Sequence, residues 1–487
     1  MTADTTNDPR AAPPPRVSSP ASGAPDDLSS PALEYRGYTV ARYNASIQRL
    51  AKLKRWYATA LVATIAVASV TFVGVRLPVT EVGRTLQWLT LVWLLPVPIL
   101  AMTIGLYFTW FRVERFALRP LPPAPSGPTP LVIFQVTSTG LNVDTVLNTV
   151  RSSLYWTRSR PDLGYRSEVW LVVEEWGYLP NRERLDVLAA EGARVVVTPL
   201  HYRTAKGTTR KGRALQYAAE VRRDLGVPLD RVFVYHQDDE TAVGEDTVLG
   251  IDEFVRAHGH EKCVGCGIIL YPQHGGDLRP SQVAEFGRTK DDIRTLFTIT
   301  SRHNLFSGFH GSHYVARADV EEETSWDVGP DMTSEDLIFE TNVRWKQGPI
   351  FHLLKGFAYE QAALHLRDQL TQRRRWFQGW WRAVLHQPFP FARKLVMTYG
   401  MLVWMSAILS VTAMVLSWVF GFSAIFVYTG ALTGFVWASM VSGFHQGYVL
   451  HRAYLPRRSI SLARFVLNGI VGGVSPLGRP HSTAINR

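Results

Sequence analysis

The sequence predicts an α/β domain with a mainly parallel sheet, inserted between groups of membrane-spanning helices. Three observations lead to this fold class: long apolar runs near both ends of the chain, alternating strand and helix patterns in the middle, and an acidic cluster where one predicted strand ends. The chain has 487 residues, which is enough for one domain of ordinary size and several spans.

Four apolar runs contain no charged residue, and each has roughly the ~20 residues that cross a ~30 Å hydrocarbon core. They cover residues 56–75, 86–110, 395–420 and 422–444. Buried core helices are the alternative, but such helices rarely stay free of charge over this length. We therefore expect an integral membrane protein with four spans.

Positively charged residues flank these runs on one side of the predicted membrane. They are Arg49, Lys52, Lys54, Arg55, Arg112, Arg115, Arg119, Arg393, Lys394, Arg452, Arg457 and Arg458. The loop between the first two runs holds only Arg76 and Arg84. The positive-inside rule therefore places both termini and the middle of the chain in the cytosol. We expect a multi-pass protein of the plasma membrane.

The formal net charge of +11 has two competing explanations. Basic residues beside membrane spans attract anionic lipid, which makes the lipid bilayer an expected partner. Nucleic acid is the other candidate partner, but the sequence contains no basic module with interleaved aromatic residues. We therefore expect no binding to nucleic acid.

The chain divides into five predicted regions. The first of them is rich in Pro, Ser, Ala and Asp and lacks an apolar face, which predicts disorder. The regions are a disordered tail (1–31), an interfacial segment with two spans (32–119), a cytosolic domain (120–387) that ends in an interfacial helix (365–387), two further spans (388–446) and a cytosolic or interfacial end (447–487).

Strand and helix patterns alternate within the cytosolic domain. Short runs of β-branched and other apolar residues predict strands at 131–136, 169–173, 194–198 and 231–235. Helical patterns lie between them at 142–156 and 211–223. This alternation predicts βαβ units and a mainly parallel sheet. Ligands bind such sheets beyond the carboxyl ends of the strands.

An acidic cluster, Asp238-Asp239-Glu240, directly follows the strand at 231–235 and two polar residues. Carboxylates two positions apart at a strand end can direct hard oxygen ligands at one place, which suits Mg²⁺ or Mn²⁺ together with phosphate oxygens. A solvated acidic turn is the alternative, and the apolar strand before the cluster makes it less favoured.

Two further motifs combine residue types that suit sugar transfer. Thr333-Ser334-Glu335-Asp336 opens a predicted helix, where a carboxylate can act as general base toward a hydroxyl. An ordinary helix start is the alternative, because acids are favoured there by the helix dipole. Gln372 to Trp376 reads QRRRW, in which Arg suits pyrophosphate and Trp suits a sugar ring. An amphipathic helix at the membrane interface is the alternative for this segment.

The three motifs occur in the order D-x-[DE], [ST]-E-D and Q-x-x-R-W, with predicted membrane helices on both sides. In this the chain resembles membrane-integrated members of glycosyltransferase family two, such as cellulose and hyaluronan synthases, over roughly residues 130–385. It is also similar to egghead-type β-1,4-mannosyltransferases in three segments, His236 to Thr241, Lys211 to Tyr217 and Gly308 to Ser312.

The resemblance implies a Rossmann-like GT-A fold, a nucleotide-sugar donor and specific residue roles. Asp238 and Glu240 would hold Mg²⁺ or Mn²⁺ on the donor diphosphate, and Asp336 would be the catalytic base. The implied donor-side residues are Glu174, Glu175, Lys211, Arg213, Asp239, Gln372 and Arg375. The implied acceptor-side residues are Trp376, Gly311, Ser312 and Glu335.

The sequence departs from the family at the nucleobase, because Glu174-Glu175 stands where these enzymes usually have Asp. A carboxylate can pair with both the N1–H and the amino group of guanine, whereas uracil offers only its N3–H. This leans toward guanine, but the preference for GDP-mannose over UDP-glucose is based on the resemblance of the three egghead-like segments. A base and a charge sink suffice for inverting transfer, so an α-linked donor would give a β-linked product on a saccharide or lipid-linked acceptor.

Two alternatives remain at this stage. A processive polysaccharide synthase that uses UDP-glucose or a related UDP-sugar would share the same motifs, and oligomers could supply the additional spans of a polymer channel. A non-catalytic membrane scaffold or a transporter subunit is the alternative outside enzymes. Transporters usually carry charged residues within their spans, and the four runs have none.

Overall fold

The computed structural model describes most of the predicted cytosolic domain and parts of its flanks. The described residues are 34–74, 80–85, 110–121, 128–272, 285, 288–289, 292, 310–348, 350–363, 366–399, 401, 416, 419–420 and 445–454. The predicted disordered tail lies outside this set.

One sheet of eight strands forms the centre of the described residues, in the order β3-β2-β1-β4-β7-β6-β8-β5. Its strands are β1 (Leu131–Ser138), β2 (Arg166–Glu174), β3 (Arg194–Thr198), β4 (Val232–Asp238), β5 (Thr241–Val243), β6 (Val264–Leu270), β7 (Tyr314–Arg317) and β8 (Phe351–Glu360). Strands β3, β2, β1 and β4 are parallel, as predicted. β7 is antiparallel to β4 and β6, and β5 is antiparallel to β8, so the sheet as a whole is mixed.

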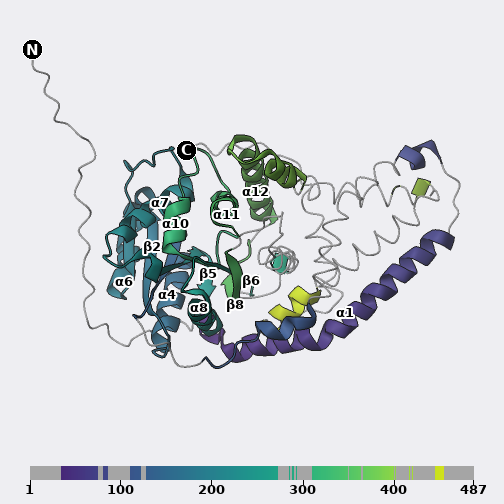
Figure 1. Ribbon diagram of the computed structural model, residues 1–487, viewed down its shortest axis with the longest axis horizontal. Helices are drawn as coiled ribbons and strands as arrows, with labels where there is room; N and C mark the ends of the chain where they lie inside the picture. Colours follow the sequence, from purple (N-terminus) through teal and green to yellow (C-terminus); the bar gives the residue numbers. More distant parts are fainter. Residues whose placement is uncertain are drawn as a thin grey trace, which may run out of the picture.

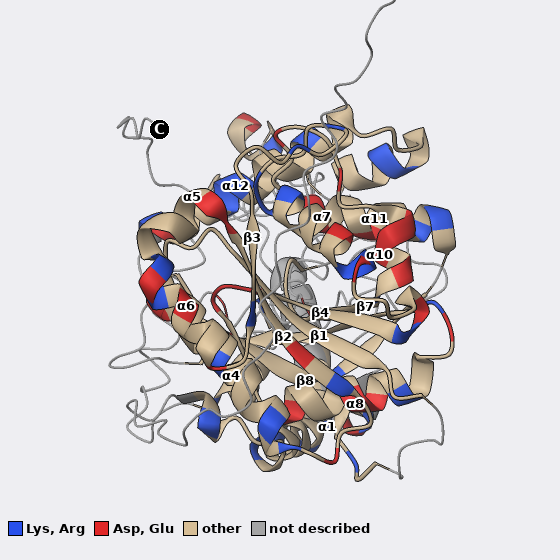
Figure 2. Cartoon of the chain, turned by 90° about the vertical axis from the view of Figure 1, so that its left-hand side faces the viewer, with Lys and Arg blue, Asp and Glu red and all other residues tan. Residues whose placement is uncertain are grey.

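Helices cover both faces of the sheet, which explains why all eight residues of β1 are buried. Alternate β1 side chains point to opposite faces. Val132 and Phe134 belong to the core cluster that includes Val146 of α4 (Val143–Ser159). Ile133 belongs to the cluster that includes Ala214 of α7 (Arg210–Arg223). Figure 2 shows α4 and α7 on opposite sides of the strands.

The remaining helices extend these two layers. They are α5 (Glu175–Tyr178), α6 (Arg182–Ala190), α8 (Glu245–His258), α10 (Ala318–Thr324), α11 (Glu335–Gln347) and α12 (Leu366–His386). Short 3-10 segments occur at Glu34–Gly37, Trp110–Phe116, Leu179–Asn181 and Leu229–Arg231. The predicted interfacial helix at 365–387 agrees closely with α12.

The long helix α1 (Val40–Gly74) begins against the domain and then leaves it (Figure 1). Tyr43 near its start donates a hydrogen bond of 2.6 Å to the carbonyl oxygen of Phe116. Tyr38, just before the helix, stacks on Tyr359 of β8 with ring centroids 3.7 Å apart. The segment predicted to approach the membrane therefore packs against β8 and the 3-10 segment at Trp110–Phe116.

The predicted membrane spans are tested only in part. The run at 56–75 forms the C-terminal part of α1, while most of 86–110, 395–420 and 422–444 lies outside the described residues. Within the part of the chain that is described, no helix has both the length and the apolar character that crossing a membrane requires. The membrane insertion of this chain stays a prediction.

Candidate active site

The residues predicted for catalysis meet beyond the carboxyl end of β4. The ammonium of Lys211, in the first turn of α7, contacts the carboxylate of Asp238 and donates a hydrogen bond of 2.7 Å to the carbonyl oxygen of Gly311. A methyl group at Gly311 would lie 3.4 Å from Asp336 Oδ2 and 3.6 Å from Asp238 Oδ2. Four residues that are far apart in the sequence thus surround one small space.

Asp239 holds the turn that follows β4. Its Oδ2 accepts a hydrogen bond of 2.8 Å from Ser138 Oγ, at the end of the neighbouring strand β1. Its carbonyl oxygen accepts one of 2.7 Å from Thr149 Oγ1 of α4. Burial raises the pKa of the Asp239 carboxyl. We predicted a donor-side role for this residue, and these contacts with β1 and α4 fix the backbone between Asp238 and Glu240.

Glu240 lies in a strongly acidic environment. Burial, followed by the charges of Glu360, Asp238 and Asp239, raises the pKa of Glu240 well above its ordinary value. The guanidinium of Arg375 on α12 acts in the opposite direction. Glu240 is therefore close enough to Arg375 for their charges to interact, as expected if both serve a diphosphate.

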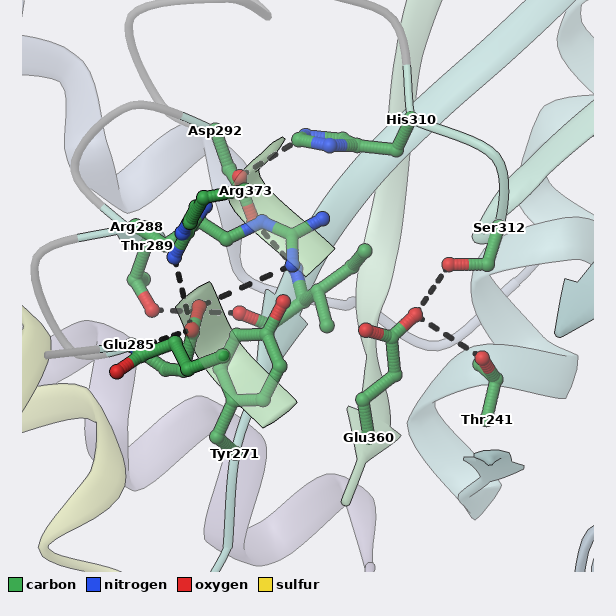
Figure 3. Close-up of polar contacts among 12 residues, drawn as sticks. Thr241, Tyr271, Glu285, Arg288, Thr289, Asp292, His310, Ser312, Glu360 and Arg373 are labelled. Atoms are coloured by element: carbon green, nitrogen blue, oxygen red, sulfur yellow. Dashed lines mark hydrogen bonds and ion pairs between the residues drawn. The ribbon is translucent and has the colours of Figure 1, made fainter. Parts of the chain in front are cut away.

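Glu360, the last residue of β8, is a site residue that the sequence analysis missed. Its Oε1 accepts a hydrogen bond of 3.0 Å from Thr241 Oγ1 and a second one from Ser312 Oγ. Figure 3 shows these contacts. Glu360 thus joins the acidic turn after β4 to the loop that contains Gly311. An acidic residue at the end of a strand was the available signal, but β8 had not been assigned as a strand.

The predicted base opens α11. Asp336 Oδ1 accepts a hydrogen bond of 2.8 Å from the backbone N–H of Leu337. Burial raises the pKa of Asp336, although the positive charge of Lys211 opposes this. Burial and the neighbouring Asp336 raise the pKa of Glu335 to about 7. A carboxylate with a raised pKa is a better proton acceptor, which suits a general base.

The helix α12 packs against the start of α11. Gly379 faces Ser334 so closely that a Cβ at position 379 would overlap Ser334 Oγ. Thr333 Oγ1 donates a hydrogen bond of 3.4 Å to the carbonyl oxygen of Arg375. The second and third predicted motifs are therefore in contact. Gln372 is half-buried on α12, and its side chain forms no hydrogen bond with the other described residues.

The ring of Trp376 contacts two guanidinium groups. The guanidinium carbons of Arg288 and Arg373 lie 4.6 and 4.5 Å from the centroid of its ring. Arg373 also donates a hydrogen bond of 2.8 Å to Glu285, as Figure 3 shows. The predicted contact of Trp376 with an acceptor sugar stays a prediction, and Arg288 is a second residue that the sequence analysis missed.

A His–Asp pair lies beside the predicted base and was also missed. His310 Nε2 lies 2.9 Å from Asp292 Oδ1, and the Asp292 carboxylate accepts a hydrogen bond of 3.0 Å from the backbone N–H of Ile269. The charge of His310 lowers the pKa of Asp336, against the larger effect of burial. His310 precedes Gly311 in the loop that we predicted to bind the acceptor, so position in the sequence was the available signal.

The residues predicted to face the nucleobase form a second cluster, at the end of β2. Glu174 is buried and forms an ion pair with Arg213 of α7. Glu175 Oε2 accepts a hydrogen bond of 2.6 Å from the backbone N–H of Leu200. Both carboxylates therefore have protein partners, and a nucleobase would have to share or replace these contacts.

The acidic residues around β4 fit a divalent cation by charge. Asp238 and Asp336 carboxylate oxygens lie 3.6 and 3.4 Å from the Cβ position of Gly311, and burial together with Glu360, Asp238 and Asp239 raises the pKa of Glu240. Asp238 and Glu240 are the residues that would hold Mg²⁺ or Mn²⁺, with hard oxygen ligands of the kind these ions prefer. The ion would neutralise charge on a diphosphate.

Geometry alone finds a different cluster of metal-ligand types among the described residues. His258, Glu261 and His352 have ligand atoms within 4.8 Å of one another. They lie at the beginning of β8, the opposite end from Glu360. The two imidazole rings stack with centroids 3.8 Å apart and planes at 20°, and His258 Nδ1 and His352 Nε2 lie 3.6 and 3.8 Å from the same oxygen of Glu261.

Comparisons with known proteins agree with the motifs. Residues 233–440 match the family model described as glycosyl transferase family group 2. The chain is 32% identical over 219 residues to Beta-1,4-mannosyltransferase egh of Drosophila melanogaster. The aligned region covers 45% of this chain and 47% of that protein. It is 29% identical over 214 residues to Beta-1,4-mannosyltransferase bre-3 of Caenorhabditis elegans. That aligned region covers 43% of this chain and 46% of the relative. The predicted resemblance to family two and to egghead-type enzymes is confirmed.

The extent of these matches is limited. The chain spans about half the length of the curated relatives that it matches. The crystal structure of S. aureus TarS 1-349 aligns with 71% of this chain and 90% of that chain at 11% identity, with a TM-score of 0.32, which is too low to carry an argument. The mixed sheet between two layers of helices is compatible with the GT-A fold that the resemblance implies.

Proposed function

We propose that this chain is an inverting, metal-dependent hexosyltransferase that forms a β-linkage on a saccharide or glycolipid acceptor. The observation that carries the proposal is the convergence of Lys211, Asp238 and Asp336 around Gly311. A cation site for a diphosphate and a carboxylate with a raised pKa then lie side by side. Inverting transfer requires these two elements and no covalent nucleophile.

In this proposal the donor and the acceptor approach from different elements. Lys211 and Arg375 contact the donor diphosphate, because both carry positive charge beside the acidic turn. Asp336 accepts the proton of the acceptor hydroxyl as the new glycosidic bond forms. Ser312, fixed by Glu360, holds the loop on the acceptor side. Trp376 completes the acceptor side, with a face for a sugar ring.

We favour mannose from GDP-mannose as the transferred sugar. The two relatives compared above are named as β-1,4-mannosyltransferases, and the family model matches residues 233–440, which include the acidic turn. The carboxylates of Glu174 and Glu175 at the end of β2 are the candidate partners for guanine. A UDP-sugar donor, used once or processively, is the second candidate function, because the three motifs serve both donors.

The proposed setting is the cytosolic face of a membrane, with the acceptor drawn from the bilayer. Two observations support it: the four apolar runs in the sequence, and the basic and aromatic face of α12 close to the third run. Labelling of a cysteine added to an exposed position between residues 128 and 272 tests the topology. An impermeant reagent should react in broken cells and should not react in intact cells.

A donor screen tests the activity itself. The purified full chain is incubated with GDP-mannose, UDP-glucose and other nucleotide sugars, each with soluble saccharides and glycolipids, and nucleotide release is measured. GDP-mannose should give the highest rate, and NMR of the product should show a β-linkage. Calorimetry with GDP and UDP in the presence of Mn²⁺ decides the base preference. Tighter UDP binding or long polymeric products would favour the second candidate.

A further inference from the structure

The ammonium of Lys211 occupies the centre of the acidic site. It contacts Asp238 and donates a hydrogen bond of 2.7 Å to the carbonyl oxygen of Gly311. A methyl group at Gly311 would lie 3.1 Å from this nitrogen and 3.4 Å from Asp336 Oδ2. The ammonium therefore touches the carboxylate that would hold the divalent ion and lies close to the predicted base.

The local charges keep Lys211 in this place. Burial opposes its positive charge, but the carboxylates of Asp238, Glu335 and Asp336 outweigh burial and raise the pKa of Lys211 above its ordinary value. The ammonium is thus a counter-ion for several acids at once. Removal of this charge without a replacement would leave those acids buried and mutually repelling.

The backbone that carries Lys211 is fixed, while its side chain is able to move. Asp327 accepts hydrogen bonds of 2.7 and 2.6 Å from Thr204 Oγ1 and Thr208 Oγ1, and one of 2.7 Å from the backbone N–H of Lys206. These contacts anchor the loop just before α7. The four-carbon stem of a lysine can nevertheless redirect its ammonium between neighbouring acceptors.

We infer that Lys211 is an internal counter-ion that holds Asp238 in the nucleotide-free protein and moves to the diphosphate when metal and nucleotide bind together. The inference rests on the proposed function, from which it takes the divalent ion and the diphosphate. An ammonium and a divalent ion on one carboxylate repel each other. The diphosphate relieves this repulsion, because its oxygens accept charge-assisted hydrogen bonds from Lys211.

The consequence is that metal and nucleotide bind cooperatively. Metal alone must displace the ammonium of Lys211 from Asp238, so it binds weakly. Nucleotide gives Lys211 a new partner and thereby frees Asp238 for the metal. Because linkage is reciprocal, metal must also strengthen nucleotide binding by the same factor, and such couplings are typically about 5- to 150-fold.

Binding of Mn²⁺, measured by EPR of the free ion, tests this inference without any turnover. The full chain and its Lys211→Met variant are titrated with Mn²⁺, with and without saturating GDP. Lys211→Met should bind Mn²⁺ alone about tenfold more tightly than the wild type, and GDP should change that affinity little. Lys211→Arg keeps the charge and should retain the cooperativity, which also controls for a folding defect of the Met variant.

Lys206→Met is the matched control for loss of one positive charge. Lys206 is exposed, and its side chain forms no hydrogen bond or ion pair with the described residues. It should behave like the wild type. The inference would be overturned if the wild type and Lys211→Met bound Mn²⁺ with equal affinity. It would also be overturned if Lys206→Met gained as much Mn²⁺ affinity as Lys211→Met. Neither result would contradict metal dependence. Absence of Mn²⁺ binding in every variant with GDP would overturn the proposed function as well.

Discussion

Substitution of Gly311 by alanine is the sharpest test of the assembled site. The added methyl group would lie 3.1 Å from Lys211 Nζ, 3.4 Å from Asp336 Oδ2 and 3.6 Å from Asp238 Oδ2. It would thus occupy the space shared by the proposed base and the proposed metal ligand. Gly311 does not have a positive φ, so the backbone accepts alanine without strain.

The expected effects on stability and on catalysis differ in size. Replacement of glycine by alanine at a compatible position stabilises by about 0.4–1 kcal/mol through the unfolded chain. Overpacking by the added methyl group destabilises by about 1–3 kcal/mol. The flexible side chain of Lys211 can move away from the methyl group, which reduces this destabilisation. The free energy of unfolding should therefore change by no more than about 2 kcal/mol. Displacement of reacting groups by about 1 Å costs on the order of 10²-fold in rate, so nucleotide release should fall by that factor.

The assay compares nucleotide release from the preferred donor with thermal denaturation of the same preparation. Gly348→Ala is the control, because its φ of +80° makes alanine strained while no atom lies within 4 Å of the added methyl group. Such strain costs about 1–3 kcal/mol, and Gly348 follows the far end of α11 from Asp336. The control should lose stability and keep its rate. A Gly311→Ala variant with the rate of the wild type would refute the proposed placement of the reacting groups.

Four further outcomes are expected. Asp336→Asn keeps the shape and removes the proton acceptor, so transfer should fall by ~10²-fold or more while GDP binding, measured by calorimetry, persists. Glu240→Ala should abolish turnover and weaken GDP binding, and full activity in excess EDTA would contradict this. Trp376→Ala should raise KM for the acceptor more than Kd for GDP, whereas a purely structural role would lower yield and leave both constants unchanged. Because the pKa of Glu335 is raised to about 7 from 4.5, the folded protein keeps a proton that the unfolded chain loses between these values. The Tm should therefore fall as pH rises from 4.5 to 7, and Glu335→Gln should reduce this dependence.

Elements with a strong local pattern were predicted well. The strand expected at 131–136 is the first part of β1, and the helix expected at 211–223 is α7 apart from one residue. The apolar, β-branched run of β1 reflects burial on both faces, which a sequence reveals directly. The helix expected at 365–387 is α12, whose basic and aromatic residues recur at helical spacing.

Long-range pairings were not predictable from local patterns. Glu360 enters the site because β8 runs parallel to β6 and ends beside Thr241 and Ser312. The pairing of Lys211 with Asp238 likewise depends on how α7 packs across β1, β2 and β3, which brings its first turn to the end of β4. Neither strand order nor side-chain pairing produces a periodic pattern in the sequence. From the sequence, Glu360, Lys211 and Asp238 could be identified only as charged residues near the ends of elements.

A buried polar network links α7 to β1 directly and to β4 through α10. Arg222, in the last turn of α7, forms an ion pair with Glu321, which in turn contacts His236 of β4. Arg222 also donates a hydrogen bond of 2.6 Å to Gln135 of β1. Burial lowers the pKa of His236, against the charge of Glu321, and its ring stacks on Tyr314 with centroids 4.4 Å apart.

This network is a poor source of net stability, because desolvation of buried charges offsets most of their attraction. Loss of Arg222 or Glu321, however, leaves the charge of the other buried without a partner. The placement of α7 beside these strands therefore tolerates little change. His236 precedes Asp238 by two residues, and Lys211 lies at the opposite end of α7 from Arg222. The same helix is thus linked to β1 by Arg222, and to β4 through Glu321, and it brings Lys211 to Asp238. The histidine of the egghead-like segment is therefore a member of the buried network two residues before Asp238, and burial lowers its pKa.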